Sequence, residues 1–314
     1  DGWFHRLFRN TNEAREPHIV TGNPIAWRER VTRHRHLRSL VGRWGFVALC
    51  TLTFIILATL YATNTVTPDS FRLWILALVC FEIVIVTFAA ISLSSSAIAK
   101  EREDGSLDLL LTTSITPKTY LAGKVRGLTV HILPMVLVPC LTMMAVGCIV
   151  LLDPSGAVVR DQLVGSNSFS DVPLALVAPA ILTPFVVFPY IAFCISLGLL
   201  WSMRSKGSIS AMVSSLILVL VVTGGLGVCL IPSSSMGHIG SFFAAMSPVN
   251  AVRSTLMSVD VIPSVISDGV ATANISLAIS SVIAGIVWSL ISMGLLRSMS
   301  ASFVVTVRRL AGIN

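Results

Sequence analysis

Charged side chains are scarce in this chain. Asp, Glu, Lys and Arg together make up 12% of its 314 residues, whereas a water-soluble domain usually carries about 25%. Hydrophobic residues make up 54%, and the mean hydropathy is +0.85. A chain with so few charges cannot cover a soluble surface of this size, so the composition predicts a membrane protein.

The sequence motifs of common catalytic sites are also missing. Hydrolysis of ATP by the usual route needs a phosphate-binding loop, G-x-x-x-x-G-K-[ST], but Gly123-Lys124 is followed by Val125 and the rest of the pattern is absent. Neither H-E-x-x-H nor G-x-S-x-G occurs. We therefore predict that the chain itself is not an enzyme and holds no cofactor or metal.

The cysteines follow neither a disulfide pattern nor a metal pattern. Each lies within an apolar stretch, and no two form the close pair that is typical of a zinc site. We expect them to be small packing residues. They are Cys50, Cys80, Cys140, Cys148, Cys194 and Cys229.

Six apolar stretches are long enough to cross a membrane, since a helix rises about 1.5 Å per residue and the hydrocarbon core is about 30 Å thick. The predicted fold class is an all-α polytopic membrane protein with six transmembrane helices. The second, third and fourth are long enough to tilt or to project beyond the bilayer. The stretches are Trp44–Thr63, Leu73–Ala99, Gly127–Leu152, Leu174–Met203, Ser208–Ile231 and Thr272–Leu296.

Lys and Arg residues lie mostly on one side of these spans. Nineteen of the 22 precede the first span, follow the last, or occupy the loops that the same topology places inside, and only Arg72, Arg160 and Arg253 lie in the other loops. An excess of Lys and Arg marks the cytoplasmic face. We therefore predict a multi-pass protein of the bacterial inner (cytoplasmic) membrane with both termini in the cytoplasm. Topology and contacts with anionic membrane lipids explain the basic balance, so no nucleic-acid partner is expected.

The spans divide the chain into three regions. Residues 1–43 form a polar, basic cytoplasmic tail, residues 44–300 form the transmembrane domain, and residues 301–314 form a second cytoplasmic tail. No cleavable signal peptide is expected, because the first region lacks an apolar core of the required length.

An amphipathic helix is predicted within the first region. Asn23 is a typical capping residue, and Pro24 suits the first helical position. Apolar residues from Trp27 onward recur on one side of a helix, with arginines mostly in other directions. We expect a helix over about residues 23–43 that lies on the inner membrane surface.

A charged loop with strong turn signals follows the second span. Lys100–Asp104 is a dense cluster of both signs, Gly105 permits a sharp turn, and Ser106 can cap a short helix over Leu107–Thr113. The leucines on one face of that helix would be buried against a partner, the membrane surface or the protein's own helices. Thr116-Pro117 then begins another helix that runs into the third span.

The loop over residues 232–271 precedes the last span and has apolar content of its own. Ser247-Pro248 predicts the start of a helix over about Val249–Val259. Loops of such length are uncommon without internal structure. A pair of short helices that dips into the outer leaflet and returns would satisfy its own backbone hydrogen bonds there.

Glu82 is the acidic residue that lies well inside a span. An ionisable group at that depth is costly and by default indicates function, such as a proton relay or a contact with substrate in a pathway. The alternative is a protonated carboxyl group that hydrogen-bonds to a neighbouring helix.

The charged loop resembles a pattern of the type-2 ABC transporter permeases, the exporter-like class of transmembrane subunits. The stretch A-K-E-R-E-D-G-S-L-D-L-L-L-T-T-S-I-T-P-K-T-Y-L-A-G-K at Ala99–Lys124 is similar to the family's E-R-E, a glycine, a leucine-rich segment, T-P and a closing G-K. Here Ser114-Ile115 precede Thr116-Pro117. Asn23–Glu29, N-P-I-A-W-R-E, resembles the amphipathic start of some bacterial permeases. The predicted topology matches over nearly all of residues 23–300.

The resemblance implies half of an ATP-driven transporter of the exporter class, whose pathway forms between two permease chains. ABC ATPase subunits that bind ATP and Mg²⁺ would dock beneath these chains. A coupling helix would seat in the ATPase, and an N-terminal connecting helix would lie beside it. The implied ATPase-coupling residues are Glu101, Arg102, Glu103, Gly105, Leu107, Leu110, Leu111 and Thr112, and those of the connecting helix are Pro24, Trp27, Arg28 and Glu29.

Two other functions remain open at this stage. A secondary transporter could use Glu82 as its proton site, although the two halves of the chain show no convincing repeat of the kind such transporters often have. A membrane module could instead transmit ATPase-driven motion without moving a solute.

Overall fold

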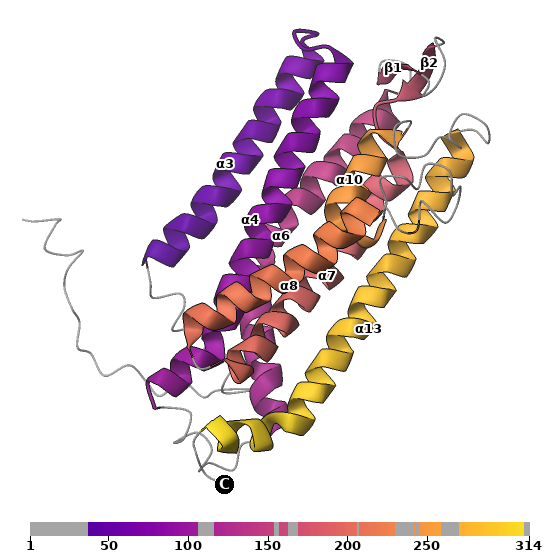
Figure 1. Cartoon of the computed structure of the whole chain (residues 1–314). Coiled ribbons are helices and arrows are strands. Elements are labelled where there is room, and N and C mark those ends of the chain that lie inside the picture. The colour runs from indigo at the N-terminus through magenta and orange to yellow at the C-terminus, as the bar shows by residue number, and fades with distance from the viewer. Residues whose placement is uncertain are drawn as a thin grey trace, which may run out of the picture.

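The computed structural model is a bundle of long helices (Figure 1). The residues that it describes are 37–105, 116–153, 157–162, 169–205, 207–229, 242, 245–258 and 270–310. Within these residues, six helices are long and apolar enough to cross a membrane, which confirms the predicted fold class. They are α3 (Leu37–Ala62), α4 (Pro68–Glu103), α6 (Pro117–Leu152), α7 (Val177–Arg204), α8 (Ser208–Cys229) and α13 (Val270–Leu310).

The ends of α4 and α6 follow from local sequence. Thr67 precedes Pro68, and Thr116 precedes Pro117; in each case the threonine hydroxyl accepts a hydrogen bond from the backbone N–H three residues later. This bond satisfies one of the free N–H groups of the first turn, and proline loses nothing at a position where its N–H would be unpaired. The predicted helix start at Thr116-Pro117 is confirmed. Gly105, with φ of 70°, ends α4 in the left-handed conformation that glycine adopts without strain.

Three of the helices are much longer than a bilayer crossing requires. α4 and α6 each have 36 residues and α13 has 41, which corresponds to about 54–62 Å of helix against about 30 Å of hydrocarbon. α13 runs through residue 300 and on to Leu310, so part of the predicted C-terminal tail continues the last span as helix. At the other end of the chain, α3 already includes residues 37–43, while the rest of the predicted interfacial helix lies outside the described residues.

α7 lies at the centre of the bundle, where it packs against α4, α6, α8 and α13. The turn between α3 and α4 lies at one end of the bundle, and α13 finishes at the other (Figure 1). One cluster of buried apolar side chains joins α4, α6, α7, α8 and α13 toward the end where α13 finishes. A second joins α4, α6 and the elements at the opposite end. Both clusters include residues of α7.

A short antiparallel hairpin joins α6 to α7, and the sequence analysis did not predict it. Its strands are β1 (Val158–Gln162) and β2 (Phe169–Pro173), with Val158 opposite Pro173. Both Val159 and Val172 are buried, and Val159 belongs to the second cluster. The hairpin closes the end of the bundle that also carries the α3–α4 turn (Figure 1).

The loop before the last span contains α10 (Pro248–Leu256), close to the predicted helix. Just before it, the Met246 carbonyl accepts a hydrogen bond of 2.9 Å from the Trp288 indole of α13. Trp288 lies 18 residues into α13 and so about 27 Å along that helix. At its other end, the Thr255 carbonyl accepts a bond of 2.9 Å from Leu176 at the start of α7. α10 thus runs alongside the bundle over part of the length of α13.

Candidate coupling interface and transmembrane cavity

The E-R-E sequence occupies the last turn of α4, and each of its three side chains reaches a different element. Glu101 accepts a hydrogen bond of 2.7 Å from Lys124 Nζ and another from the Tyr120 hydroxyl, both on α6. Arg102 donates to the Ser205 carbonyl just after α7. Glu103 accepts a bond of 2.9 Å from the Ser208 N–H at the start of α8, where the helix dipole favours a carboxylate. These charges therefore hold the ends of four helices together.

The Glu101–Lys124 ion pair is largely shielded from solvent. The Lys124 side chain is 2% exposed and that of Glu101 is 14% exposed. Lys124 also donates to the Ala97 carbonyl at 3.4 Å and lies against the Tyr120 ring. An ion pair of this kind holds a fixed geometry, because separating the partners leaves a buried charge uncompensated.

The same tie closes the base of the predicted coupling loop. Glu101 lies four residues before Gly105, where α4 ends, and Tyr120 lies four residues after Thr116, where the next helix begins. Residues 106–115 between these points lie outside the described residues, and with them Leu107, Leu110, Leu111 and Thr112. Pro24, Trp27, Arg28 and Glu29 of the predicted connecting helix also lie outside.

α4 and α7 approach each other closely just beneath this cluster. The Ser202 hydroxyl of α7 accepts hydrogen bonds of 3.0 and 2.9 Å from the backbone N–H groups of Ile98 and Ala99. Gly198 faces Ser94, and a Cβ built on the glycine would lie 1.9 Å from the Ser94 hydroxyl oxygen. The contact requires glycine, so α4 and α7 pack backbone to backbone next to the E-R-E sequence.

Sequence reasoning found the E-R-E residues but missed their partners. Lys124 was visible as the closing residue of the G-K pair, yet nothing local pairs it with a glutamate 23 positions earlier. Arg43 was placed in the polar N-terminal tail, whereas its side chain is buried and donates to the His131 carbonyl of α6 at 3.2 Å. That bond fixes the α3 end nearest the E-R-E cluster.

A cavity of about 340 Å³ lies between α4, α7, α8 and α10. Its walls are mostly apolar, and the residues that line it include no charged side chain. Polar groups come from each element: Thr87 of α4, Tyr190 of α7, Thr223 of α8 and Asn250 of α10. The Tyr190 hydroxyl faces Thr87 and Thr223. Such a cavity suits an uncharged molecule with a large apolar part and a hydrogen-bonding group.

Glu82 lies outside this cavity. Its side chain is fully buried on α4, where it faces Cys50 of α3 and Thr142 of α6, and it is not among the residues that line the cavity. Neither carboxyl oxygen has a hydrogen-bond partner of normal geometry within the part of the chain that the structure describes. The Thr142 hydroxyl donates instead to the Val138 carbonyl at 3.0 Å. Burial of a charged carboxylate without partners is very costly.

Comparison with protein families places most of the chain in a known family. A family described as ABC-2 family transporter protein matches residues 77–296, which is well over half of the chain and extends from α4 into α13. The chain belongs to the ABC-2 transporter family. Comparison with curated proteins gave no match. The resemblance seen in the charged loop is therefore confirmed.

This ABC-2 family member is a multi-pass membrane protein and a permease subunit of a transporter. Permeases of this family work with ABC ATPase partners. The matched residues contain the E-R-E cluster with its partners on α6, α7 and α8, and all the residues that line the cavity. α3 lies before the match.

Proposed function

We propose that this ABC-2 permease subunit is driven by ATP through the loop after α4, which docks on a separate ATPase subunit that holds ATP and Mg²⁺. The observation that supports this most is the tie between Glu101 and the Lys124–Tyr120 pair at the base of that loop. A force applied to residues 106–115 is delivered through it to α4 and α6 together. Both termini then lie in the cytoplasm of a bacterial cell, and the direction of transport is outward.

The cluster supports a specific route for the motion. Arg102 and Glu103 connect the end of α4 to the turn between α7 and α8. α4 and α8 are also walls of the 340 Å³ cavity. A displacement of the α4 end that is passed to α8 changes the separation of those walls, and the cavity alternates between access to the two sides. Two permease chains would together form the pathway.

The cargo that fits this cavity is amphipathic or lipidic. Hydroxyl and amide groups line the cavity without any charge, and a charged cargo would lose its hydration there without compensation. Residues 245–258 would act as a re-entrant segment that forms the outer wall of the site.

Gentle purification from the native membrane tests this function. We expect an ABC ATPase subunit to accompany the wild-type chain and to be lost with Leu110→Asp, because the substitution would bury a charge in the ATPase groove. Leu152→Asp is the matched control, since Leu152 is 84% exposed at the far end of α6. A well-inserted Leu110→Asp chain that still binds the ATPase would count heavily against the assignment of the coupling loop.

One observation favours a second candidate function, proton-coupled transport through Glu82. The carboxyl group is fully buried and has no hydrogen-bond partner within the described residues, as a proton-carrying group in a span would be. This candidate predicts that transport follows a proton gradient, needs no ATPase and is abolished by Glu82→Gln. Full transport by the Glu82→Gln chain would exclude it.

A further inference from the structure

α3 and α4 form an antiparallel pair that is joined at two places. Near their connecting turn, Tyr61 stacks on Phe71 with 4.5 Å between ring centroids. Farther along, Cys50 of α3 faces Glu82 of α4. The two contacts are 11 residues apart on both helices, which corresponds to about 16 Å of helix. These two places mark the ends of a short stretch of the helix pair.

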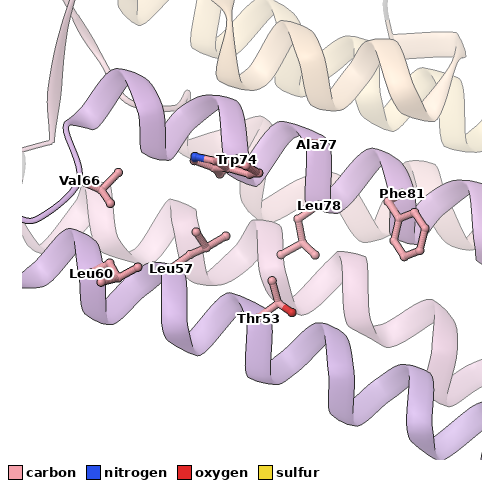
Figure 2. A pocket seen from close by; sticks show the side chains of 8 residues that line it. All are labelled: Thr53, Leu57, Leu60, Val66, Trp74, Ala77, Leu78 and Phe81. Carbon is pink, nitrogen blue, oxygen red and sulfur yellow. The ribbon is translucent and has the colours of Figure 1, made fainter.

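Between these contacts the pair leaves an open groove. Its volume is about 600 Å³, and Figure 2 shows side chains of both helices around the space between them. Its apolar walls are formed by Leu57, Leu60, Trp74, Ala77, Leu78 and Phe81. Thr53 also lines it, but its hydroxyl donates to the Leu49 carbonyl of its own helix at 2.9 Å. The walls of the groove are therefore mostly apolar, and besides Thr53 only the Trp74 indole carries a polar group among the residues that line it.

We propose that this α3–α4 groove binds one acyl chain of a membrane lipid, from the leaflet on the side of the α3–α4 turn. The distance between these two places, about 16 Å, is close to half of the hydrocarbon thickness of about 30 Å. A chain from a single leaflet thus fills the groove from its mouth to the Cys50–Glu82 contact.

The width of the groove favours a hydrocarbon chain over a helix. Its volume of about 600 Å³, spread over about 16 Å, gives a mean cross-section of about 36 Å², and a helix with its side chains, about 10–12 Å wide, needs more than twice that area. A second protein chain could insert only side chains. A flexible chain without polar groups fits the full length.

The mouth of the groove provides a place for the polar headgroup. Val66 lines it at the α3–α4 turn, and the neighbouring Thr63, Asn64 and Thr65 are exposed and polar. The headgroup lies at the level of this turn while the acyl chain extends along the groove.

The lipid would complete the attachment of α3. Among residues 41–62, only Arg43 and Cys50 are buried, so protein contacts alone cover little of this helix. An acyl chain in the groove adds apolar contacts along the seam between α3 and α4, and dispersion contacts of this kind are individually small but collectively large.

Photolabelling tests the proposal on the full-length chain in nanodiscs of phosphatidylethanolamine and phosphatidylglycerol. The probe is a small fraction of phosphatidylcholine that carries a photoreactive diazirine in its acyl chain. After irradiation and digestion, mass spectrometry maps the labelled residues. We expect Leu57, Leu60 and Leu78 to be labelled several-fold more than Ile55 and Ile56, which are about half exposed but lie outside the groove.

A blocking variant sharpens the test. Ala77→Phe fills the groove and should reduce labelling of Leu57 several-fold, while Ala48→Phe, at an exposed position of α3 outside the groove, should leave it unchanged. Equal labelling of groove and non-groove residues in the wild type would show ordinary surrounding lipid and overturn the proposal. Absent groove labelling together with cross-links from Leu57 to a second copy would show a protein occupant and would also overturn it. The distribution of labels over the wild-type chain decides between these outcomes even if Ala77→Phe fails to fold.

Discussion

At the scale of single residues, the ion pair between Glu101 and Lys124 is the clearest local determinant. Glu101→Gln leaves the Lys124 ammonium group, on a side chain that is 2% exposed, without its carboxylate. Loss of one partner from a buried pair typically costs about 3–5 kcal/mol, so we expect a marked fall in melting temperature in detergent. Glu103→Gln is the control and should have a much smaller effect, because Glu103 is exposed and accepts one backbone N–H.

The double variant separates charge burial from helix packing. Replacing both partners, Glu101→Gln with Lys124→Met, removes the orphaned ammonium group and should recover much of the lost stability. If Glu101→Gln and Glu103→Gln lowered the melting temperature equally, the buried tie would not be the structural element that we describe.

Two glycines of α13 give a matched pair for packing. A Cβ added at Gly285 would lie 2.1 Å from the Phe185 carbonyl oxygen of α7, whereas one added at Gly294 meets nothing within 4 Å. Gly285→Ala must push α7 and α13 apart, and overpacking of this kind costs about 1–3 kcal/mol. Gly294→Ala should be neutral or slightly stabilising, since alanine favours helix. Thermal unfolding measures both, and equal melting temperatures would contradict the packing of α7 on α13.

At the scale of elements, α10 is held in place by an indole. Trp288→Phe removes the hydrogen bond to the Met246 carbonyl and leaves a partly buried acceptor without its partner, which costs up to about 3 kcal/mol. In the described part of the chain the Trp201 indole N–H has no partner, so Trp201→Phe keeps most of the packing and loses no bond. We expect a lower melting temperature for Trp288→Phe alone. A larger effect at Trp201 would show that the indole bond does not seat α10.

The elements also show what sequence could predict. A typical capping residue followed by proline predicted the starts of the helices after Thr116 and Ser247, because this signal acts within one helical turn. The length of the apolar stretches predicted all six spans. The β1–β2 hairpin was missed because its strands have five residues each, too few for a periodic signal to stand out. Likewise, the partners of Glu101 and Arg43 depend on how α3, α4 and α6 lie side by side, which no local pattern contains.

At the scale of the whole molecule, the charged E-R-E cluster and the uncharged cavity lie in different parts of the bundle. The E-R-E cluster binds the helix ends, and the uncharged cavity lies within the bundle between α4, α7, α8 and α10. α4 belongs to both. Because α4 packs closely on α7 through Gly198 and Ser202, it connects the loop that follows it to the cavity walls.

The most direct test is the accessibility of the cavity in the complex with its ATPase subunit. Asn250 of α10 lines the cavity, and Asn250→Cys, in a background without the native cysteines, can be labelled with a maleimide in nanodiscs. We predict that the labelling rate changes several-fold between the nucleotide-free and the ATP-bound complex, and that Glu101→Gln reduces this change. A labelling rate that is the same in both states, with ATP hydrolysis intact, would contradict the coupling of this ABC-2 permease to ATP.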